Sequence, residues 1–258
     1  MKGSNDGSVV VTGATSGFGR AIATRFARSG ARVVAIGRRA DRLAELASGL
    51  GDGCLPLVLD VGDAAAVRRA IDALPASHRT VAVLVNNAGV TLGNAPAHAT
   101  DPADWKRTVD TNVGGMLNLT QAVLPGMVAR DFGDIVNIGS IAAHYPYPGG
   151  HVYGATKAFV RQFTLNLRAD LLGHNVRAIC IEPGTARTEF AQVRMGSASA
   201  AQAFYAQPNL LEAEDVAEIV HFCCSLPRRV NVNALEVMPI SQSFASMPFA
   251  AGMRPLVG

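Results

Sequence analysis

Tyr153 and Lys157 are four positions apart, so on a helix they lie on one face, with the lysine ammonium near the tyrosine phenol. A phenol titrates at pH ~10 in water, and a neighbouring positive charge favours its ionised form. Such a phenol can accept the proton of an alcohol or return a proton to a carbonyl oxygen. Ser140 follows a predicted strand and can hydrogen-bond the same oxygen. These three side chains indicate proton transfer at an alcohol or carbonyl oxygen.

A glycine-rich turn follows the first predicted strand and opens a helix. Its glycines allow a tight turn and a close approach to a pyrophosphate, whose charge is favoured at a helix start. Glycine turns without a ligand are common, but the place of this one between a strand and a helix favours dinucleotide binding. The expected contacts are Gly13, Thr15, Ser16, Gly17, Phe18 and Gly19.

The end of the second predicted strand distinguishes the two common dinucleotides. An acidic residue there binds a ribose 2′-OH, whereas Arg38 and Arg39 of this chain would bind a 2′-phosphate. The alternative is a solvated arginine pair, but cations are mildly unfavourable at a helix start. The sequence therefore predicts NADP. Residues after the third and fourth strands are expected near adenine and ribose: Asp60, Val61, Asn87, Ala88 and Gly89.

These residues need a parallel sheet to bring them together. Apolar runs at 8–12, 32–36, 55–59, 81–85, 134–138 and 176–181 read as strands buried on both faces. Helical spacing fills 19–29, 40–50, 63–74, 104–130 and 152–172. The alternation predicts one doubly wound Rossmann domain over 1–258, with about seven parallel strands and helices on both faces.

Length and composition limit the other possibilities. A chain of 258 residues with 49% hydrophobic and 17% charged residues can bury a large core. The net charge of +3 creates no strong field toward nucleic acid or a membrane. No segment reaches the ~18 apolar residues that span a bilayer. The four cysteines lack metal-ligand spacing, so we expect reduced thiols, no metal and a cytoplasmic protein.

Two segments depart from the alternation of strands and helices. Residues 185–212 are rich in Ala, Ser and Gln and follow a strand end, where open sheets bind ligands, so a mobile lid is expected there. An ordinary surface connection is the alternative, although loops of this length are uncommon. Residues 241–258 mix Phe, Met and Pro without period, which suits either a tail on a neighbouring subunit or a frayed terminus.

The glycine turn, Asn86-Asn87-Ala88-Gly89, Asn112, Ser140 and Tyr153-Gly154-Ala155-Thr156-Lys157 together resemble the short-chain dehydrogenase/reductase family. The resemblance covers about residues 8–249 and implies hydride transfer between NADP and an alcohol carbon. It assigns Asn112 to a water that links Lys157 to solvent. It also implies a homotetramer packed through the helices at 104–130 and 152–172. Its nicotinamide segment corresponds here to Pro183, Gly184, Thr185 and Thr188.

Three longer stretches, 122–128, 145–163 and 235–239, resemble the NADP-dependent 3-hydroxy acid dehydrogenases. That resemblance implies substrates of the L-allo-threonine, L-serine and 3-hydroxypropionate class, with malonic semialdehyde as a carbonyl substrate. Between Gly184 and Thr188 this chain is one residue shorter than members of that group. The lid conformation and the contacts to the substrate carboxylate therefore stay open.

A 3-hydroxy acid brings a carboxylate to the site, and Arg can bind a carboxylate with two parallel hydrogen bonds. Four residues are candidates for contacts with the substrate in addition to Ser140, and Arg194 is preferred among them. They are Tyr147, His151, Arg187 and Arg194. Each could equally be an ordinary lid or loop residue. His144 lies in the same loop as Tyr147 and receives no role.

Two other functions fit parts of the pattern. A reductase of the same fold could act on another carbonyl, such as a 3-oxoacyl group on a carrier protein, and activity on free hydroxy acids would distinguish it. A non-catalytic protein that senses NADP would not need Ser140, Tyr153 and Lys157 together. Taken singly, each catalytic candidate has an ordinary structural interpretation, but their joint occurrence with the dinucleotide pattern favours an enzyme.

Overall fold

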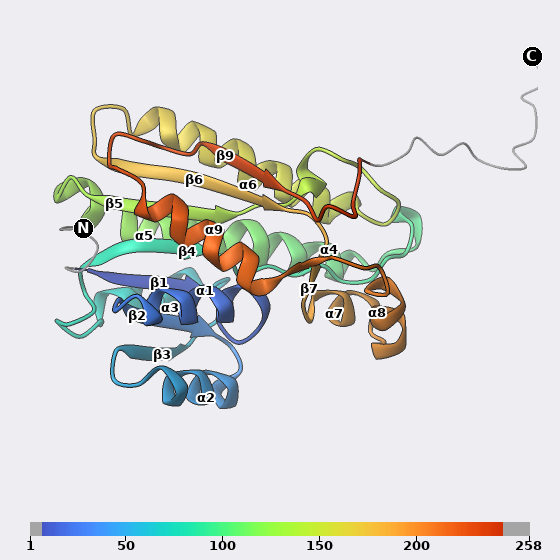
Figure 1. Cartoon of the computed structure of the whole chain (residues 1–258), viewed down its shortest axis with the longest axis horizontal. Helices are drawn as coiled ribbons and strands as arrows, with labels where there is room; N and C mark the ends of the chain where they lie inside the picture. Colours follow the sequence, from blue (N-terminus) through green and yellow to red (C-terminus); the bar gives the residue numbers. More distant parts are fainter. Residues whose placement is uncertain (1–6, 245–258) are drawn as a thin grey trace, which may run out of the picture.

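Seven parallel strands form one sheet in the computed structural model, which describes residues 7–244 (Figure 1). Their order across the sheet is β3-β2-β1-β4-β5-β6-β9. The chain moves outward from β1 to β3 and then returns to the other side of β1, so the switch of direction lies between β1 and β4. The strands are β1 Ser8–Thr12, β2 Arg32–Gly37, β3 Cys54–Val58, β4 Val81–Asn86, β5 Gly133–Ile138, β6 Val176–Pro183 and β9 Ala234–Val237.

The predicted strands are confirmed, and most of their Val and Ile runs are buried on both sides of the sheet. β1, β4, β5 and β6 are buried along their whole length. Helices α1 (Gly17–Arg28), α2 (Ala40–Leu50) and α9 (Ala213–Ser225) pack on one face. Helices α3 (Ala64–Asp72), α5 (Gly115–Ala129) and α6 (His151–Asp170) pack on the other. The doubly wound fold predicted from the alternation is therefore confirmed.

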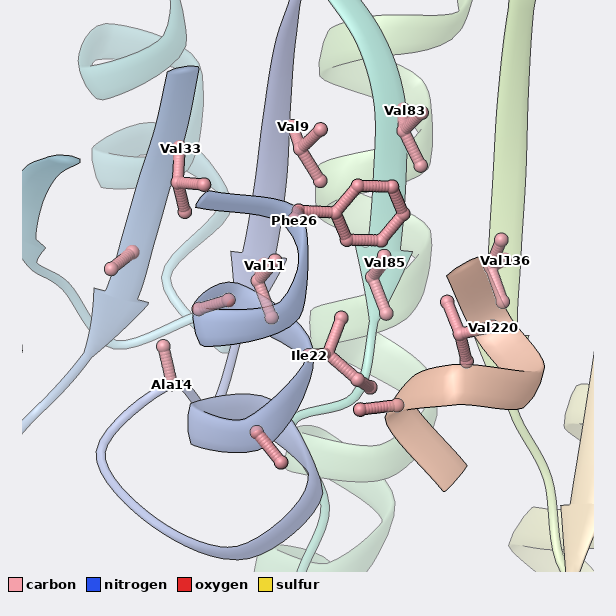
Figure 2. Close-up of a cluster of buried hydrophobic side chains, with 14 of the residues drawn as sticks. Val9, Val11, Ala14, Ile22, Phe26, Val33, Val83, Val85, Val136 and Val220 are labelled. Carbon is pink, nitrogen blue, oxygen red and sulfur yellow. The ribbon is translucent and has the colours of Figure 1, made fainter. Parts of the chain in front are cut away.

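Figure 2 shows the part of the hydrophobic core that packs against β1 and β4, the strands between which the direction of the chain switches. Val9 and Val11 of β1 and Val83 and Val85 of β4 point toward the helices, where they meet Ile22 and Phe26 of α1 and Val220 of α9. The packing holds the middle and the end of α1 against the sheet.

The helix predicted at 104–130 is interrupted in the structure. Helix α4 (Pro102–Val109) is followed by a π-helical turn at Asp110–Gly114 and then by α5. The side chain of Asn112 in this turn bonds to the backbone of Val90 and to Thr156 instead of facing solvent. Gly115 lies so close to Val61 that a side chain there would collide with it. The wider turn accommodates these two contacts.

The segment predicted as a lid folds into short elements beyond the carboxyl end of the sheet (Figure 1). These are β7 Ala186–Arg187, α7 Phe190–Met195, α8 Ala198–Phe204 and β8 Leu211–Glu212, with β7 and β8 paired in a small parallel sheet. Of the predicted tail, residues 245–258 lie outside the described residues. In the part of the chain that the structure describes, no helix has the length and apolar character needed to cross a membrane.

Candidate active site

A cavity of about 610 Å³ opens at the carboxyl ends of β1 to β6. Its walls are formed by nearly every residue that the sequence predicted to contact a dinucleotide or to move a proton. These are Gly13, Thr15, Ser16, Gly17, Phe18, Arg38, Arg39, Asp60, Val61, Asn87, Ala88, Gly89, Ser140, Tyr153, Lys157, Pro183, Gly184, Thr185 and Thr188. Gly19 and Asn112 lie just behind its wall.

The glycine turn needs glycine for two different reasons. Gly13 and Gly17 have φ values of +67° and +49°, a backbone conformation that side chains disfavour. Gly19 has no such strain, but a Cβ there would collide with the carbonyl of Gly13 and lie 2.6 Å from Asn87 Nδ2. The side chain of Asn87 in turn donates to the carbonyl of Thr12 at 2.8 Å. Helix α1 therefore starts in direct contact with the loop after β4, and Gly19 serves packing instead of lining the cavity.

The two predicted phosphate-binding arginines lie in different environments. The side chain of Arg38 is 57% exposed, and its nearest acid is Asp60 at 3.9 Å. Arg39 donates to the hydroxyl oxygens of Thr15 and Ser16, each at 2.8 Å, and to Glu189 Oε2 at 3.0 Å. Arg38 thus has its guanidinium available to a ligand, whereas most of the donors of Arg39 are engaged.

Glu189 is a cavity residue that the sequence reasoning missed. It immediately precedes α7, and its second carboxylate oxygen accepts a hydrogen bond from Arg42 Nη1 at 2.5 Å. Partial burial opposes ionisation, but the hydrogen bonds from Arg42 and Arg39 outweigh it and hold the pKa of Glu189 below its ordinary value. Helix α7 is therefore attached to the start of α2. The available sequence signal for Glu189 was its position directly after Thr188, in a chain whose predicted nucleotide end carries a basic cluster.

Tyr153 and Lys157 lie on one face of α6, as their spacing predicted, and both are buried. Lys157 Nζ is 5.7 Å from the centre of the Tyr153 ring and donates to the carbonyl of Ile138 at 2.7 Å. Burial lowers the pKa of Lys157 to about 8. Burial raises the pKa of Tyr153 above its ordinary value and Tyr147 adds to this, while a hydrogen bond with Ser140 and the charge of Arg194 lower it.

Ser140 lies at the end of β5, where a short 3₁₀ turn (Ile141–Ala143) begins. Its hydroxyl oxygen accepts a hydrogen bond from the backbone N–H of Ala142 at 3.1 Å and so is held in place. Four residues after Ser140, His144 Nε2 lies 3.1 Å from Oε1 of Glu182, a buried acid at the end of β6. His144, which had no assigned role, therefore connects the turn after Ser140 to the strand that precedes the predicted nicotinamide segment.

Asn112 is buried behind the loop that follows β4. Its Oδ1 accepts from Val90 N at 2.7 Å, and its Nδ2 donates to Val90 O at 2.9 Å and to Thr156 Oγ1 at 3.0 Å. A Cβ on Gly89 would lie 3.4 Å from Asn112 Oδ1 and 3.7 Å from Lys157 Nζ. Asn112 and Lys157 therefore both lie close to Gly89, and the structure brings them near each other.

The four candidate contacts for a substrate carboxylate are divided by the structure. Tyr147 and Arg194 line the cavity, with Arg194 Nη1 3.5 Å from the Tyr147 hydroxyl and its guanidinium 5.0 Å from the Tyr147 ring centre. Burial raises the pKa of Tyr147, and the charge of Arg194 opposes this. These two residues from separate elements place a cation beside a phenol hydroxyl in one corner of the cavity, near Tyr153.

His151 and Arg187, which the sequence also predicted as substrate contacts, are not among the residues that line this cavity. His151 Nε2 is 3.2 Å from the carbonyl of Ala95, and its Nδ1 accepts from Val152 N at 2.9 Å, so the ring turns toward the loop after β4. The exposed Arg187 bonds to Glu212 at 3.1 Å and to the carbonyl of Tyr205 at 2.9 Å. Sequence position alone did not reveal which way these side chains point.

Comparison with known proteins places the chain in a family. Residues 8–198 match the short chain dehydrogenase family. The chain is a short-chain dehydrogenase. Its serine 3-dehydrogenase relative from Rhizobium radiobacter is 47% identical over 240 residues, 93% of this chain and 96% of the relative. An NADP-dependent 3-hydroxy acid dehydrogenase, YdfG of Salmonella typhi, is 51% identical over 241 residues, 93% of this chain and 97% of that one.

Two further similarities extend over nearly the whole length of this dehydrogenase. Sulfoacetaldehyde reductase 2 of Chromohalobacter salexigens is 51% identical and covers 92% of this chain and 96% of its own. A solved structure of the closed form of serine dehydrogenase complexed with NADP⁺ superposes with a TM-score of 0.92 at 50% identity, covering 94% of this chain and 98% of that one. The predicted family and fold are therefore confirmed.

Proposed function

We propose that this short-chain dehydrogenase transfers a hydride between NADP and C3 of a 3-hydroxy acid. The observation that carries the proposal is the Arg194–Tyr147 corner, which lies in the same cavity as Ser140, Tyr153 and the glycine turn. A cation and a phenol hydroxyl suit a substrate carboxylate, and the Ser–Tyr pair suits the alcohol oxygen. The relatives named serine 3-dehydrogenase and 3-hydroxy acid dehydrogenase support this choice.

The residues present fit NADP. Gly13 and Gly17 keep the turn at the start of α1 free of side chains, so backbone N–H groups can approach a pyrophosphate. The exposed guanidinium of Arg38 at the end of β2 is available to a 2′-phosphate, and Asp60 and Val61 lie beside it for the adenine end. Pro183, Gly184, Thr185 and Thr188 line the opposite part of the cavity and would hold the nicotinamide end.

The proton side of the reaction belongs to the protein. When bound, NADP would supply the acceptor for the hydride of the alcohol carbon, and its positive nicotinamide would favour ionisation of a nearby phenol. Ser140 would hold the substrate oxygen at the Tyr153 hydroxyl, and Tyr153 would take the alcohol proton. In reduction, Tyr153 would return that proton to the carbonyl oxygen. The cationic Lys157 would stabilise the phenolate of Tyr153. We assign Asn112 to binding a water that passes the proton on toward solvent.

The proposal is tested by removing the cation of the corner. Arg194→Gln is expected to raise KM for 3-hydroxypropionate roughly tenfold to a hundredfold, because the carboxylate loses its ionic partner, while KM for NADP stays unchanged. Arg187→Gln is the matched control, since this guanidinium lies in the same segment but outside the cavity. Equal KM values for Arg194→Gln and the wild type would contradict the proposal.

A 3-oxoacyl reductase of the same family would need a surface for its carrier protein. The dense basic cluster of this chain, which comprises Arg38, Arg39 and Arg42, lies at the nucleotide end of the cavity, where two of its arginines bind Glu189. This arrangement favours a free acid as the substrate. Turnover of free hydroxy acids at saturating NADP distinguishes the two.

Three finer features belong to the same proposal. We assign the protein to the cytoplasm, and the lid at 185–212 to opening and closing over the substrate. We also propose a homotetramer, supported by the exposed ring of Phe159 on α6, which stacks on Phe163 with 6.1 Å between ring centres. Light scattering of the purified protein tests the assembly, and a monomer would contradict it.

A further inference from the structure

Strand β6 holds the serine turn, residues 139–144, at both of its ends. At the first residue of the turn, the backbone N–H of Gly139 donates to the carbonyl of Ile181 at 2.7 Å. At its last residue, His144 Nε2 lies 3.1 Å from Glu182 Oε1. The two anchors are consecutive residues of β6. Ser140 therefore lies between two points of attachment to one strand.

Helix α6 also packs against the serine turn. Ala142 is buried, and its carbonyl oxygen would lie 3.0 Å from a Cβ at Gly154. Because Gly154 directly follows Tyr153, this close approach brings the turn up to the part of α6 that carries the tyrosine. Within the turn, the backbone N–H of Ala142 donates to the Ser140 hydroxyl oxygen at 3.1 Å. A shift of the turn along β6 would therefore move the Ser140 hydroxyl relative to Tyr153.

Glu182 is an unusual residue for the end of a buried strand. Its side chain is 2% exposed, and burial raises the pKa of its carboxyl group, while His144 and Arg161 act to lower it. Its register partner on the neighbouring strand β9 is another acid, Glu236, which adds to the raised pKa. A buried ion pair is often no more stable than an apolar pair of similar volume. The Glu182 carboxylate is therefore better explained by the groups that it holds than by fold stability.

Two groups share the Glu182 carboxylate and differ in what they bring to it. Arg161 of α6 approaches Oε1 with its Nε at 3.3 Å and supplies a positive charge. His144 can donate a hydrogen bond from Nε2 whether its ring is neutral or protonated. Arg161 thus balances the buried charge, and the bond with His144 is the one that reaches the serine turn.

We infer that His144 is a positioning residue, whose bond to Glu182 holds the serine turn so that the Ser140 hydroxyl meets the substrate oxygen at Tyr153. Neither His144 nor Glu182 is among the residues that line the active-site cavity, so their effect must pass through Ser140. Rates are sensitive to such alignment, since a displacement of about 1 Å can cost a hundredfold. The inference rests on the proposed function, which assigns Ser140 to the substrate oxygen.

Two substitutions separate the hydrogen bond of His144 from its bulk. His144→Gln keeps an N–H donor near the place of Nε2, whereas His144→Leu has no donor. With 3-hydroxypropionate and saturating NADP, kcat of His144→Leu is expected to fall about tenfold, and kcat of His144→Gln to stay within about threefold of the wild type. Both variants should fold, because Arg161 still balances Glu182, and KM for NADP should be unchanged. Equal kcat values for the two variants would overturn the inference.

A double-mutant cycle with Ser140→Ala tests whether His144 acts through Ser140. Ser140→Ala alone is expected to lower kcat about a hundredfold. Because no serine hydroxyl then remains to be positioned, adding His144→Leu should change kcat by less than about twofold. The same tenfold loss in both backgrounds would overturn the inference while leaving the role of Ser140 intact. Wild-type turnover by Ser140→Ala would contradict the proposed role of Ser140, and the inference with it.

Discussion

Tyr153 must be a phenol in one direction of the reaction and a phenolate in the other, and burial in the protein favours only the phenol. Burial raises the pKa of its phenol, which suits an acid that must give up a proton only to a substrate, whereas oxidation of an alcohol needs the phenolate. Tyr153→Phe is therefore expected to lower kcat by about a hundredfold to ten-thousandfold. NADPH binding, measured by fluorescence, should be retained. A variant with wild-type turnover would remove Tyr153 from proton transfer.

Lys157 illustrates the cost of a buried cation. Its pKa is lowered to about 8, so the folded state disfavours the charge that the unfolded chain keeps up to its ordinary pKa. The cost is fully present below pH 8 and disappears as the pH rises toward the unfolded value. Urea unfolding of the wild type and Lys157→Met should show this directly. Between pH 7 and pH 9.5, the unfolding free energy of the wild type should rise by about 2 kcal/mol relative to that of Lys157→Met.

A pH-independent difference between these two proteins would mean that Lys157 keeps an ordinary pKa in the fold. Tyr153→Phe provides a control for the stability measurement, because Tyr153 lies beside Lys157 but its pKa is raised, so its phenol stays neutral over this range.

The residues of the site differ in how far their sequence revealed them. Tyr153, Lys157 and Ser140 were predictable because their types and spacing define a reaction, and α6 and the end of β5 bring them together. Arg194 was preferred to Arg187 in the sequence, although both are cations in one segment. Only the direction of each side chain, toward Tyr147 or toward Glu212, separates them.

At the scale of elements, we expect the end of β2 and the start of α2 to decide which dinucleotide the site prefers. Arg38 is exposed beside the cavity, while Arg39 and Arg42 hold Glu189 at the start of α7. Arg38→Ala is therefore expected to raise KM for NADP about tenfold or more and to leave KM for NAD nearly unchanged. Glu189→Gln leaves Arg38 in place and should keep the preference for NADP. An unchanged NADP preference in Arg38→Ala would contradict this assignment.

The elements themselves followed from hydrophobic pattern wherever burial is complete. The strands β1, β4, β5 and β6 are such runs, and their predicted positions agree with the structure to within a few residues. The strand β9 is short and lies at the sheet edge, where the pattern is weak. The break between α4 and α5 arises from tertiary contacts of Asn112, which helical spacing does not report. The same holds for α7, whose position depends on the ion pairs of Glu189 with Arg39 and Arg42.

At the scale of the whole molecule, one sheet brings a nucleotide half and a reacting half to a common edge. The order β3-β2-β1-β4-β5-β6-β9 places the glycine turn after β1 next to Asn87 after β4, and Ser140 after β5 next to the Pro183 segment after β6. The alternation of strands and helices predicted this arrangement, because parallel strands present their carboxyl ends together. The assembly of subunits depends on surfaces that such a pattern does not encode, and it stays a proposal.

The central claim is that one cavity binds NADP and the carboxylate of a hydroxy acid at the same time. It is tested most directly by the initial rate of NADPH or NADH formation with the purified protein. NADP and NAD are compared against 3-hydroxypropionate, L-serine, L-allo-threonine and a secondary alcohol without a carboxylate. With NADP, kcat/KM for the hydroxy acids should exceed kcat/KM for the secondary alcohol by about a hundredfold or more. Equal or faster oxidation of the plain alcohol would contradict the claim.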